Sequence, residues 1–237
     1  MLTKENLNEA LADAVMGRPR EFFIDDRRFS LWSPSLGMTL MTERHISLLG
    51  IDSLMMTRNP SLEALRLSEK NRAEVCNILA IHSYRRYKDL SDSEKLRARA
   101  DYFSSHLSTD EIAQLFLIIL SEPRIETFLQ LSGISEDQKE QSRIAQFKNK
   151  DGHNRTFGGK TIYGMIIDAA CRAYGWTKEY TVWGIDLLSL RLMLADTISS
   201  VYLSDDDIKQ MGIIVSSKDC IGMTAEDFEQ LKKEFND

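Results

Sequence analysis

Three side chains could form a nucleophile with acid–base partners if the fold brought them together. They are the thiol of Cys76, the imidazole of His82 and the carboxylate of Asp168. A thiol becomes a strong nucleophile when a nearby base removes its proton, and such pairs meet in space rather than in sequence. No neighbouring residue marks Cys76 as activated, and His82 lies beside apolar helical positions, where a histidine is more often a satisfied core residue. We therefore expect no enzyme, with a dispersed catalytic site as the alternative.

Metal and phosphate sites have little support in the sequence. The four histidines lie far apart, without the spacing of a zinc-protease pair. Cys76, Cys171 and Cys220 are odd in number and widely spaced, which argues against a disulfide framework or a zinc site. Residues 158–161, Gly-Gly-Lys-Thr, resemble the end of a phosphate-binding loop, but Asn154 stands where that loop needs glycine. We expect no metal and no cofactor.

A short segment alternates aromatic and basic residues, as proteins that bind single-stranded nucleic acid do. It runs from Tyr84 to Lys88, but on a helix these two residues share a face while Arg85 turns away. The net charge of -6 also disfavours a nucleic-acid partner. A solvated helix edge is the preferred interpretation, and a nucleic-acid-binding regulator that uses Arg85, Arg86 and Lys88 is kept as a further alternative.

The elements that must position these groups are mostly helices. Only 12 glycines and 4 prolines occur in 237 residues, and scarcity of both helix breakers favours a mostly α fold, a bundle or array of several helices. One small N-terminal β-hairpin is expected over residues 20–32. Its apolar residues alternate around a polar corner at residues 25–27, and they are Phe22, Ile24, Phe29 and Leu31. No segment reaches the roughly 18 apolar residues of a membrane span.

Helix starts and stops are marked by capping residues. An amphipathic helix is expected over residues 3–16, and a helical stripe from residue 36 ends at Gly50. Asn59 before Pro60 is a favourable start for another helix, and Ser204 followed by three acids predicts an N-cap rather than a calcium loop. Capping-box spacing occurs at Ser91 with Glu94, Ser108 with Glu111, Ser135 with Gln138, and Thr224 with Asp227.

A change of composition over residues 138–161 suggests two parts of one packed unit. Residues 1–150 would hold the N-terminal helix, the hairpin and a helical body, and residues 151–237 an aromatic-rich helical part. In the second part we expect a helix over residues 161–176 and another over residues 187–202. The first should face inward with Ile162, Met165, Ile166, Ala169, Ala170 and Ala173.

Large aromatic and apolar side chains crowd residues 174–202. Thr177 can cap a short helix that clusters the rings, and the helix that follows is apolar on two adjoining stripes, so it must be covered on more than one side. A central core helix is the simpler explanation. The other is a surface for a protein partner, because Trp, Tyr and Met are enriched at interface anchors. The candidate partner-binding residues are Trp176, Tyr180, Trp183, Leu187, Leu190, Met193 and Leu194.

Two stretches resemble the tail assembly chaperones of long-tailed bacteriophages and prophages. They are Arg28-Phe-Ser-Leu-Trp-Ser-Pro-Ser-Leu-Gly37 and Tyr174-Gly-Trp-Thr-Lys-Glu-Tyr-Thr-Val-Trp-Gly184, together about a tenth of the chain. The resemblance implies a helical, non-catalytic protein in the cytoplasm of the bacterial host cell, with no cofactor. Its partner would be the long, apolar, helical tape-measure protein, which such chaperones keep soluble during tail assembly.

Overall fold

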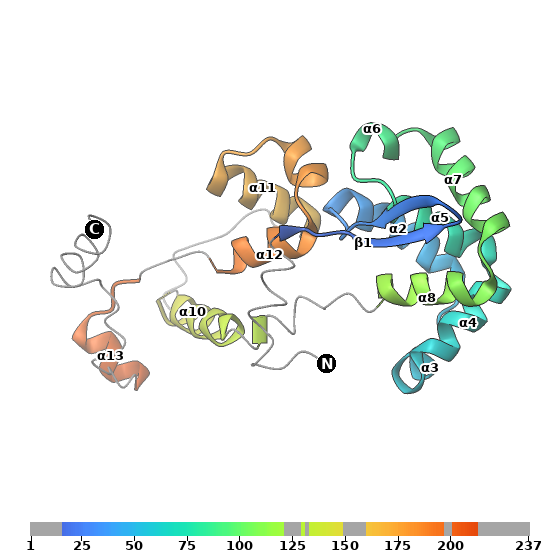
Figure 1. Cartoon of the computed structure of the whole chain (residues 1–237). Coiled ribbons are helices and arrows are strands. Elements are labelled where there is room, and N and C mark those ends of the chain that lie inside the picture. The colour runs from blue at the N-terminus through green and yellow to red at the C-terminus, as the bar shows by residue number, and fades with distance from the viewer. Residues whose placement is uncertain (1–15, 121–128, 131–132, 149–159, 197–200, 213–237) are drawn as a thin grey trace, which may run out of the picture. The chain divides into compact units, whose positions relative to one another are not determined.

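The computed structural model describes residues 16–120, 129–130, 133–148, 160–196 and 201–212 (Figure 1). The chain divides into two compact units, Met1–Thr197 and Ile198–Asp237. The described residues form helices and one two-stranded antiparallel hairpin, so the mostly α fold predicted from the sequence is confirmed. The predicted N-terminal helix and the predicted boundary near residue 150 fall almost wholly on residues 1–15 and 149–159, outside the described residues.

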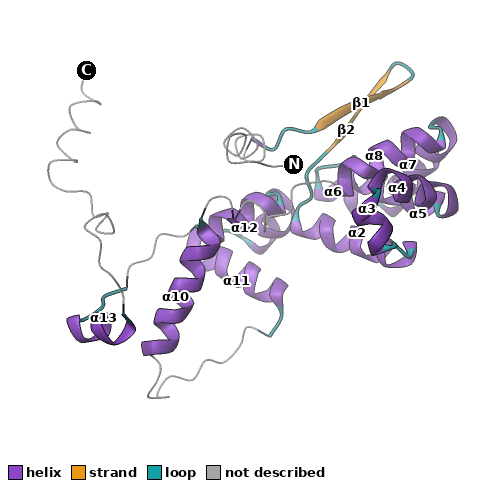
Figure 2. Cartoon of the chain, turned by 90° about the horizontal axis from the view of Figure 1, so that it is seen from below, coloured by secondary structure: helices purple, strands orange, loops and turns teal. Residues whose placement is uncertain are grey.

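The hairpin pairs β1 (Arg20–Ile24) with β2 (Arg27–Leu31), as the alternating apolar residues predict (Figure 2). Phe22 and Phe29 are cross-strand partners, and their ring centroids lie 5.5 Å apart. Both rings also contact Phe103 of the helical body, at centroid distances of 5.8 and 5.3 Å. An isolated two-stranded hairpin is marginal in water, so this aromatic cluster is what holds the strands on the helices.

The helical body is built around α5 (Arg72–His82). Its other helices are α2 (Leu36–Leu49), α3 (Ser53–Arg58), α4 (Pro60–Lys70), α6 (Tyr87–Leu90), α7 (Ser93–His106) and α8 (Thr109–Leu120). α5 packs against α2, α7 and α8, and α4 packs against α8. Ile78 and Leu79 of α5 are fully buried, together with Phe103 and Phe116. Each such side chain contributes about 1.5–3 kcal/mol by leaving water, so this region carries most of the apolar stabilisation.

Three helix ends agree with the capping residues expected from the sequence. Asn59 accepts a hydrogen bond from the Leu62 amide at 3.1 Å, and Gly50 ends α2 with a left-handed φ of 60°. Ser108 and Glu111 each accept from the other's backbone amide, at 3.3 and 2.7 Å. These bonds satisfy amides that the first turn of a helix leaves without a partner.

Two predicted caps are wrong, the first by one residue and the second by two. Asp92, not Ser91, caps α7, where its carboxylate accepts from the Lys95 amide at 3.0 Å. Asp is at least as good an N-cap as Ser, so the sequence offered two equivalent choices. Ser135 lies inside α10 (Ile134–Lys148), because the helix starts directly after Gly133, whose φ is 83°.

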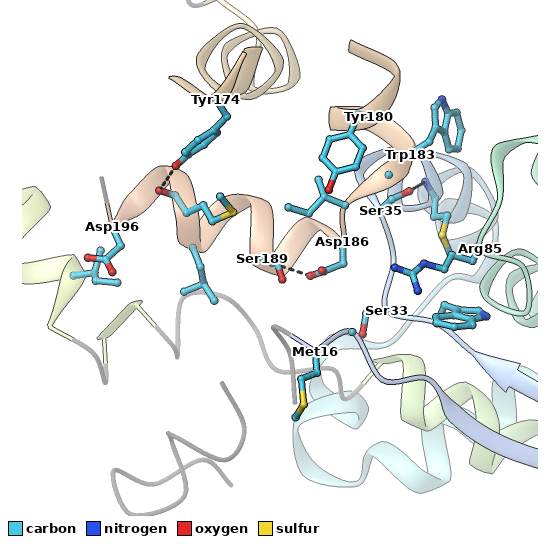
Figure 3. Close-up of a pocket in the computed structure, with 18 residues that line it drawn as sticks. Met16, Ser33, Ser35, Arg85, Tyr174, Tyr180, Trp183, Asp186, Ser189 and Asp196 are labelled. Carbon is cyan, nitrogen blue, oxygen red and sulfur yellow. Dashed lines mark hydrogen bonds between the residues drawn. The ribbon is translucent and has the colours of Figure 1, made fainter. Parts of the chain in front are cut away.

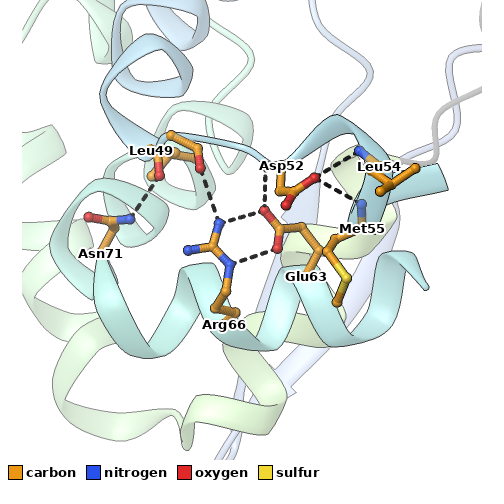
Figure 4. A network of polar contacts seen from close by, with 8 residues as sticks. Leu49, Asp52, Leu54, Met55, Glu63, Arg66 and Asn71 are labelled. Atoms are coloured by element: carbon orange, nitrogen blue, oxygen red, sulfur yellow. Dashed lines mark hydrogen bonds and ion pairs between the residues drawn. The ribbon is translucent and has the colours of Figure 1, made fainter. Parts of the chain in front are cut away.

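A polar network holds the loop between α2 and α3 against α4 (Figure 4). Glu63 is fully buried, and its carboxylate accepts hydrogen bonds from Arg66 at 2.7 and 2.6 Å and from the Asp52 amide at 2.8 Å. Arg66 also donates to the Gly50 carbonyl at 3.1 Å. The hydrogen bonds from Arg66, aided by the Asp52 amide, hold the pKa of Glu63 below its ordinary value. The network is therefore strongest while the carboxylate is ionised.

The rest of the first unit contains α10, α11 (Ile162–Tyr174), the π-helix η1 (Tyr180–Gly184) and α12 (Leu187–Ala195). The predicted helix over residues 187–202 is too long, since α12 ends at Ala195 and residues 201 and 202 lie outside any helix. The sequence after Asp196 begins Thr-Ile-Ser-Ser, and these are weak helix formers. In the second unit, Ser204 caps α13 (Asp205–Met211) as predicted.

The inward face predicted for α11 is also wrong. Ile162 and Met165 are 68% and 45% exposed, Ala169 and Ala173 are exposed, and only Ala170 is buried. Among the described elements, α11 packs chiefly against α12 and η1, so only one side of it is covered. The periodic pattern identified an apolar face correctly but did not say whether another element lies on it.

Candidate binding pocket

The turn that leads into η1 arranges the aromatic residues. The Thr177 hydroxyl accepts a hydrogen bond from the Tyr180 amide at 3.2 Å, so Thr177 is the predicted cap. The ring of Trp176 lies 4.7 Å from Tyr174 and 5.0 Å from Tyr180, measured between centroids. The rings therefore cluster around one short helix as the sequence indicates. The π-helical form of this turn was not predicted, and such turns are frequent at functional sites.

Trp183 extends from the same turn onto α2, where its approach requires a glycine. A Cβ atom added to Gly37 would lie 2.3 Å from the indole ring, closer than any side chain tolerates. The ring of Tyr87 covers another part of the indole, with centroids 4.8 Å apart. Gly184 has the same role for Tyr180, since a Cβ there would lie 2.3 Å from the phenol ring.

Backbone contacts fix the start of α12 to the start of α2. The Leu187 amide donates to the Pro34 carbonyl at 2.8 Å, and Ser35 and Asp186 form an isolated antiparallel bridge. Asp186 also caps α12, because its carboxylate accepts from the Ser189 amide at 2.7 Å. The segment after the hairpin and the segment after η1 thus form one junction.

A pocket of about 660 Å³ opens at this junction (Figure 3). Its lining comes mainly from the chain before and after the hairpin, from η1 and from α12, with single residues from α2, α10, α11 and the segment between α5 and α6. All of these belong to the first unit. Large apolar side chains form most of the wall, among them Trp32, Met38, Tyr174, Tyr180, Trp183 and Leu192. The volume is within the range of known ligand pockets, roughly 300–1,000 Å³.

A few polar groups lie in the apolar wall. They are Ser33, Ser35, Arg85, Asp186, Ser189 and Asp196. The guanidinium of Arg85 stacks over the Trp32 ring, 4.8 Å from its centroid. The hydroxyl oxygen of Ser189 is buried and has no hydrogen-bond partner among the described residues. Asp186 caps α12 and Arg85 lies over the Trp32 ring, so both side chains help to position the wall.

The structure brings some of the predicted partner-binding residues together and separates others. Tyr180, Trp183 and Met193 line the pocket, and Tyr180 and Met193 remain 46% and 38% exposed. Leu190 is fully buried and belongs to the core. Trp176 supports Tyr180 from outside the lining. Two further residues are half-buried and do not line the pocket, namely Leu187 and Leu194.

Fifteen of the 18 lining residues were not among the predicted partner-binding residues. Trp32, Met38 and Arg85 lie far from the aromatic stretch in sequence and meet it only through the junction. The one available signal was Gly37 near the start of α2, since a glycine inside a helix often permits a close approach. That signal does not identify Trp183 as the approaching ring.

The three residues considered for catalysis have separate surroundings. His82 is buried, with Nδ1 3.2 Å from the Trp32 carbonyl and Nε2 3.3 Å from the Thr42 hydroxyl, so it is the satisfied core histidine that was expected. Burial lowers the pKa of His82 to about 4, and its bond to the Trp32 carbonyl opposes this shift. Burial raises the pKa of the Cys76 thiol. Asp168 pairs with Arg172 on exposed α11.

The segment that alternates aromatic and basic residues was expected to form one helix edge, and it does not. α5 ends at His82 and α6 begins at Tyr87, so Tyr84, Arg85 and Arg86 lie between helices. The aromatic rings are engaged within the fold, Tyr84 by Lys95 and Arg99, and Tyr87 by Trp183. The rings therefore serve internal contacts.

No group of three or more potential metal ligands occurs among the described residues, and none of the described helices could cross a bilayer. No family model matches the chain, and no curated protein or solved structure is significantly similar to it.

Proposed function

We propose that the protein is a non-catalytic chaperone or assembly factor that binds an apolar helical segment of another protein in this pocket. The observation that supports the proposal is an apolar pocket of about 660 Å³ in which Tyr180 and Met193 stay partly exposed. Covering such surface is favourable because it removes apolar area from water. Aromatic side chains and methionine are common anchors at protein interfaces, and the flexible Met side chain adapts to irregular apolar ligands.

A helix suits the exposed apolar surface better than a small molecule does. Two further apolar side chains, Ile162 and Met165, are exposed on α11, the helix that packs against α12 and ends at the lining residue Tyr174. A small ligand would cover the pocket alone. An amphipathic helix places apolar side chains at successive turns and can cover a longer surface, with a few anchors contributing most of the affinity.

The resemblance to phage tail assembly chaperones suggests a tape-measure-like protein as the partner. The two stretches that carry the resemblance contact each other, because Trp183 of the second lies against Gly37 of the first. The resembling residues thus form one structural element beside the pocket, which supports their treatment as a single functional unit.

Co-expression with a long helical tape-measure-like protein tests the proposal. We expect a soluble complex with the wild-type protein and loss of that complex with Met193→Glu, which places a charge in the apolar wall. Leu48→Glu is the matched control, because Leu48 is 65% exposed on α2 and lies outside the pocket. Equal recovery of the partner with both variants, or no recovery with the wild type, would contradict the proposal.

A further inference from the structure

We infer that the pocket selects a helix with a basic residue and an acidic residue at opposite ends of its apolar face. The basic residue would face Asp196 and the acidic residue would face Arg85. This inference rests on the proposed function, since it specifies the charge pattern of the same partner. It follows from the state of each charged group in the pocket lining.

Asp196 is a carboxylate without a partner in the described part of the chain. It follows the last residue of α12, and its backbone amide donates to the Leu192 carbonyl at 2.9 Å. Its side chain makes no hydrogen bond or ion pair with the described residues, although it lines the pocket. The carboxyl end of a helix is the negative end of its dipole, so α12 adds to the negative potential there. A Lys or Arg of the partner would relieve this accumulation of negative charge.

Asp186 differs from Asp196 because its carboxylate already has a structural role as the N-cap of α12. It lies at the amino end of α12, where the helix dipole is positive, and it accepts the Ser189 amide at 2.7 Å. Both interactions offset its charge. The charge of Asp186 at the amino end of α12 is therefore offset, whereas the charge of Asp196 at the carboxyl end is not.

Arg85 supplies the opposite charge. Its guanidinium is held over the Trp32 ring at 4.8 Å but has no carboxylate partner among the described residues. A guanidinium that lies over an aromatic ring still has N–H donors available for a carboxylate. Figure 3 shows Arg85 and Asp196 at opposite ends of the labelled lining, with Asp186 and Ser189 between them. The apolar wall thus runs between a free base and a free acid.

Three synthetic amphipathic peptides of about 20 residues, long enough to form helices, test the inference with the full-length protein. They share one apolar face. The first carries Lys at one end of that face, the second carries Glu at the other end, and the third carries Gln at both ends. For exposed ion pairs we expect the Lys and Glu peptides to bind about threefold more tightly than the Gln peptide at low salt. Asp196→Asn should remove the advantage of the Lys peptide only, and Arg85→Gln that of the Glu peptide only.

The outcomes separate this inference from the proposed function. Equal affinities for all three peptides would overturn the charge pattern and leave helix binding intact. If no peptide binds while a neutral apolar molecule such as dodecanol does, both proposals fail. Self-association of the protein that Asp196→Lys abolishes would identify a second copy of this chain as the occupant, and this would also overturn the inference. Melting temperatures of the variants should match the wild type, because both side chains lie outside the core.

Discussion

Two helices with similarly apolar sequences are covered to very different extents. α8 buries Ile112, Ala113, Leu115 and Phe116, whereas α12 buries only Leu190. α8 packs against both α4 and α5, while among the described elements α12 packs against α11 and the start of α10. The difference lies in the number of elements that cover each helix, not in its composition. The body therefore encloses its apolar residues, and the region around α12 leaves part of its apolar surface exposed.

Phe103→Ala should have the largest effect, because this ring joins the hairpin to the body. Removing a fully buried Phe costs about 3–5 kcal/mol of unfolding free energy. Urea denaturation followed by circular dichroism measures this loss. A loss below about 1 kcal/mol would contradict the conclusion that the helical body is a well-enclosed core.

His82 should make the stability of the body fall as the solution becomes acidic. Its pKa is about 4 in the fold, against 6.5 for an exposed histidine, so the unfolded chain takes up the proton first. Stability should decrease by about 3 kcal/mol between pH 6.5 and pH 4. His82→Gln should flatten this dependence in urea titrations across that range. An unchanged slope in the variant would show that His82 is not buried in its neutral form.

Glu63→Gln tests the polar network of the body. The substitution removes the charge that pairs with Arg66, so we expect a loss of about 1–3 kcal/mol at neutral pH. The pKa of Glu63 is lowered in the fold, so its contribution is present above the ordinary carboxylate pKa and is lost as the pH falls through the folded value. Wild type and variant should converge in acid, and a difference that persists at pH 2 would contradict this mechanism.

Gly37→Ala tests the contact that joins the two regions. The added methyl group collides with Trp183, and such overpacking costs about 1–3 kcal/mol. In a Trp183→Ala background the same change should be neutral or stabilising, because alanine favours a helix over glycine by about 1 kcal/mol. A double-mutant cycle measures this change of sign. Additive effects would show that the ring does not lie on Gly37.

Tyr180→Ala should have the smallest effect on stability, because its ring is 46% exposed. We expect a loss below about 1 kcal/mol, together with weaker peptide binding. Urea denaturation measures the loss of stability. The result is to be compared with that of Phe103→Ala in the helical body. A loss as large as that of Phe103→Ala would place the aromatic stretch in the core.

Features that depend on neighbouring residues were predictable from the sequence. The alternation of apolar and polar residues around Phe22 and Ile24 predicted the hairpin, and Asn59 followed by Pro60 predicted the start of α4. Each of these features is determined within a few residues, by the two-residue period of a strand or by a side chain that caps a nearby amide.

Features that depend on distant contacts were not predictable. The approach of Trp183 to Gly37 and the place of Arg85 in the pocket arise only when separate helices pack. The exposure of Ile162 has the same origin, since an apolar stripe shows which face would prefer burial but not whether an element covers it. The sequence therefore located the part of the pocket that residues 174–202 form. The part formed by Trp32, Met38 and Arg85 could be identified only from the structure.

Calorimetric titration with the neutral amphipathic peptide tests most directly whether the region around α12 binds a helix. We predict saturable one-to-one binding by the wild type and by Leu48→Glu, with the negative heat-capacity change of apolar burial, and affinity about tenfold lower for Met193→Glu. Absence of binding by the wild type, or equal binding by Met193→Glu, would contradict the account.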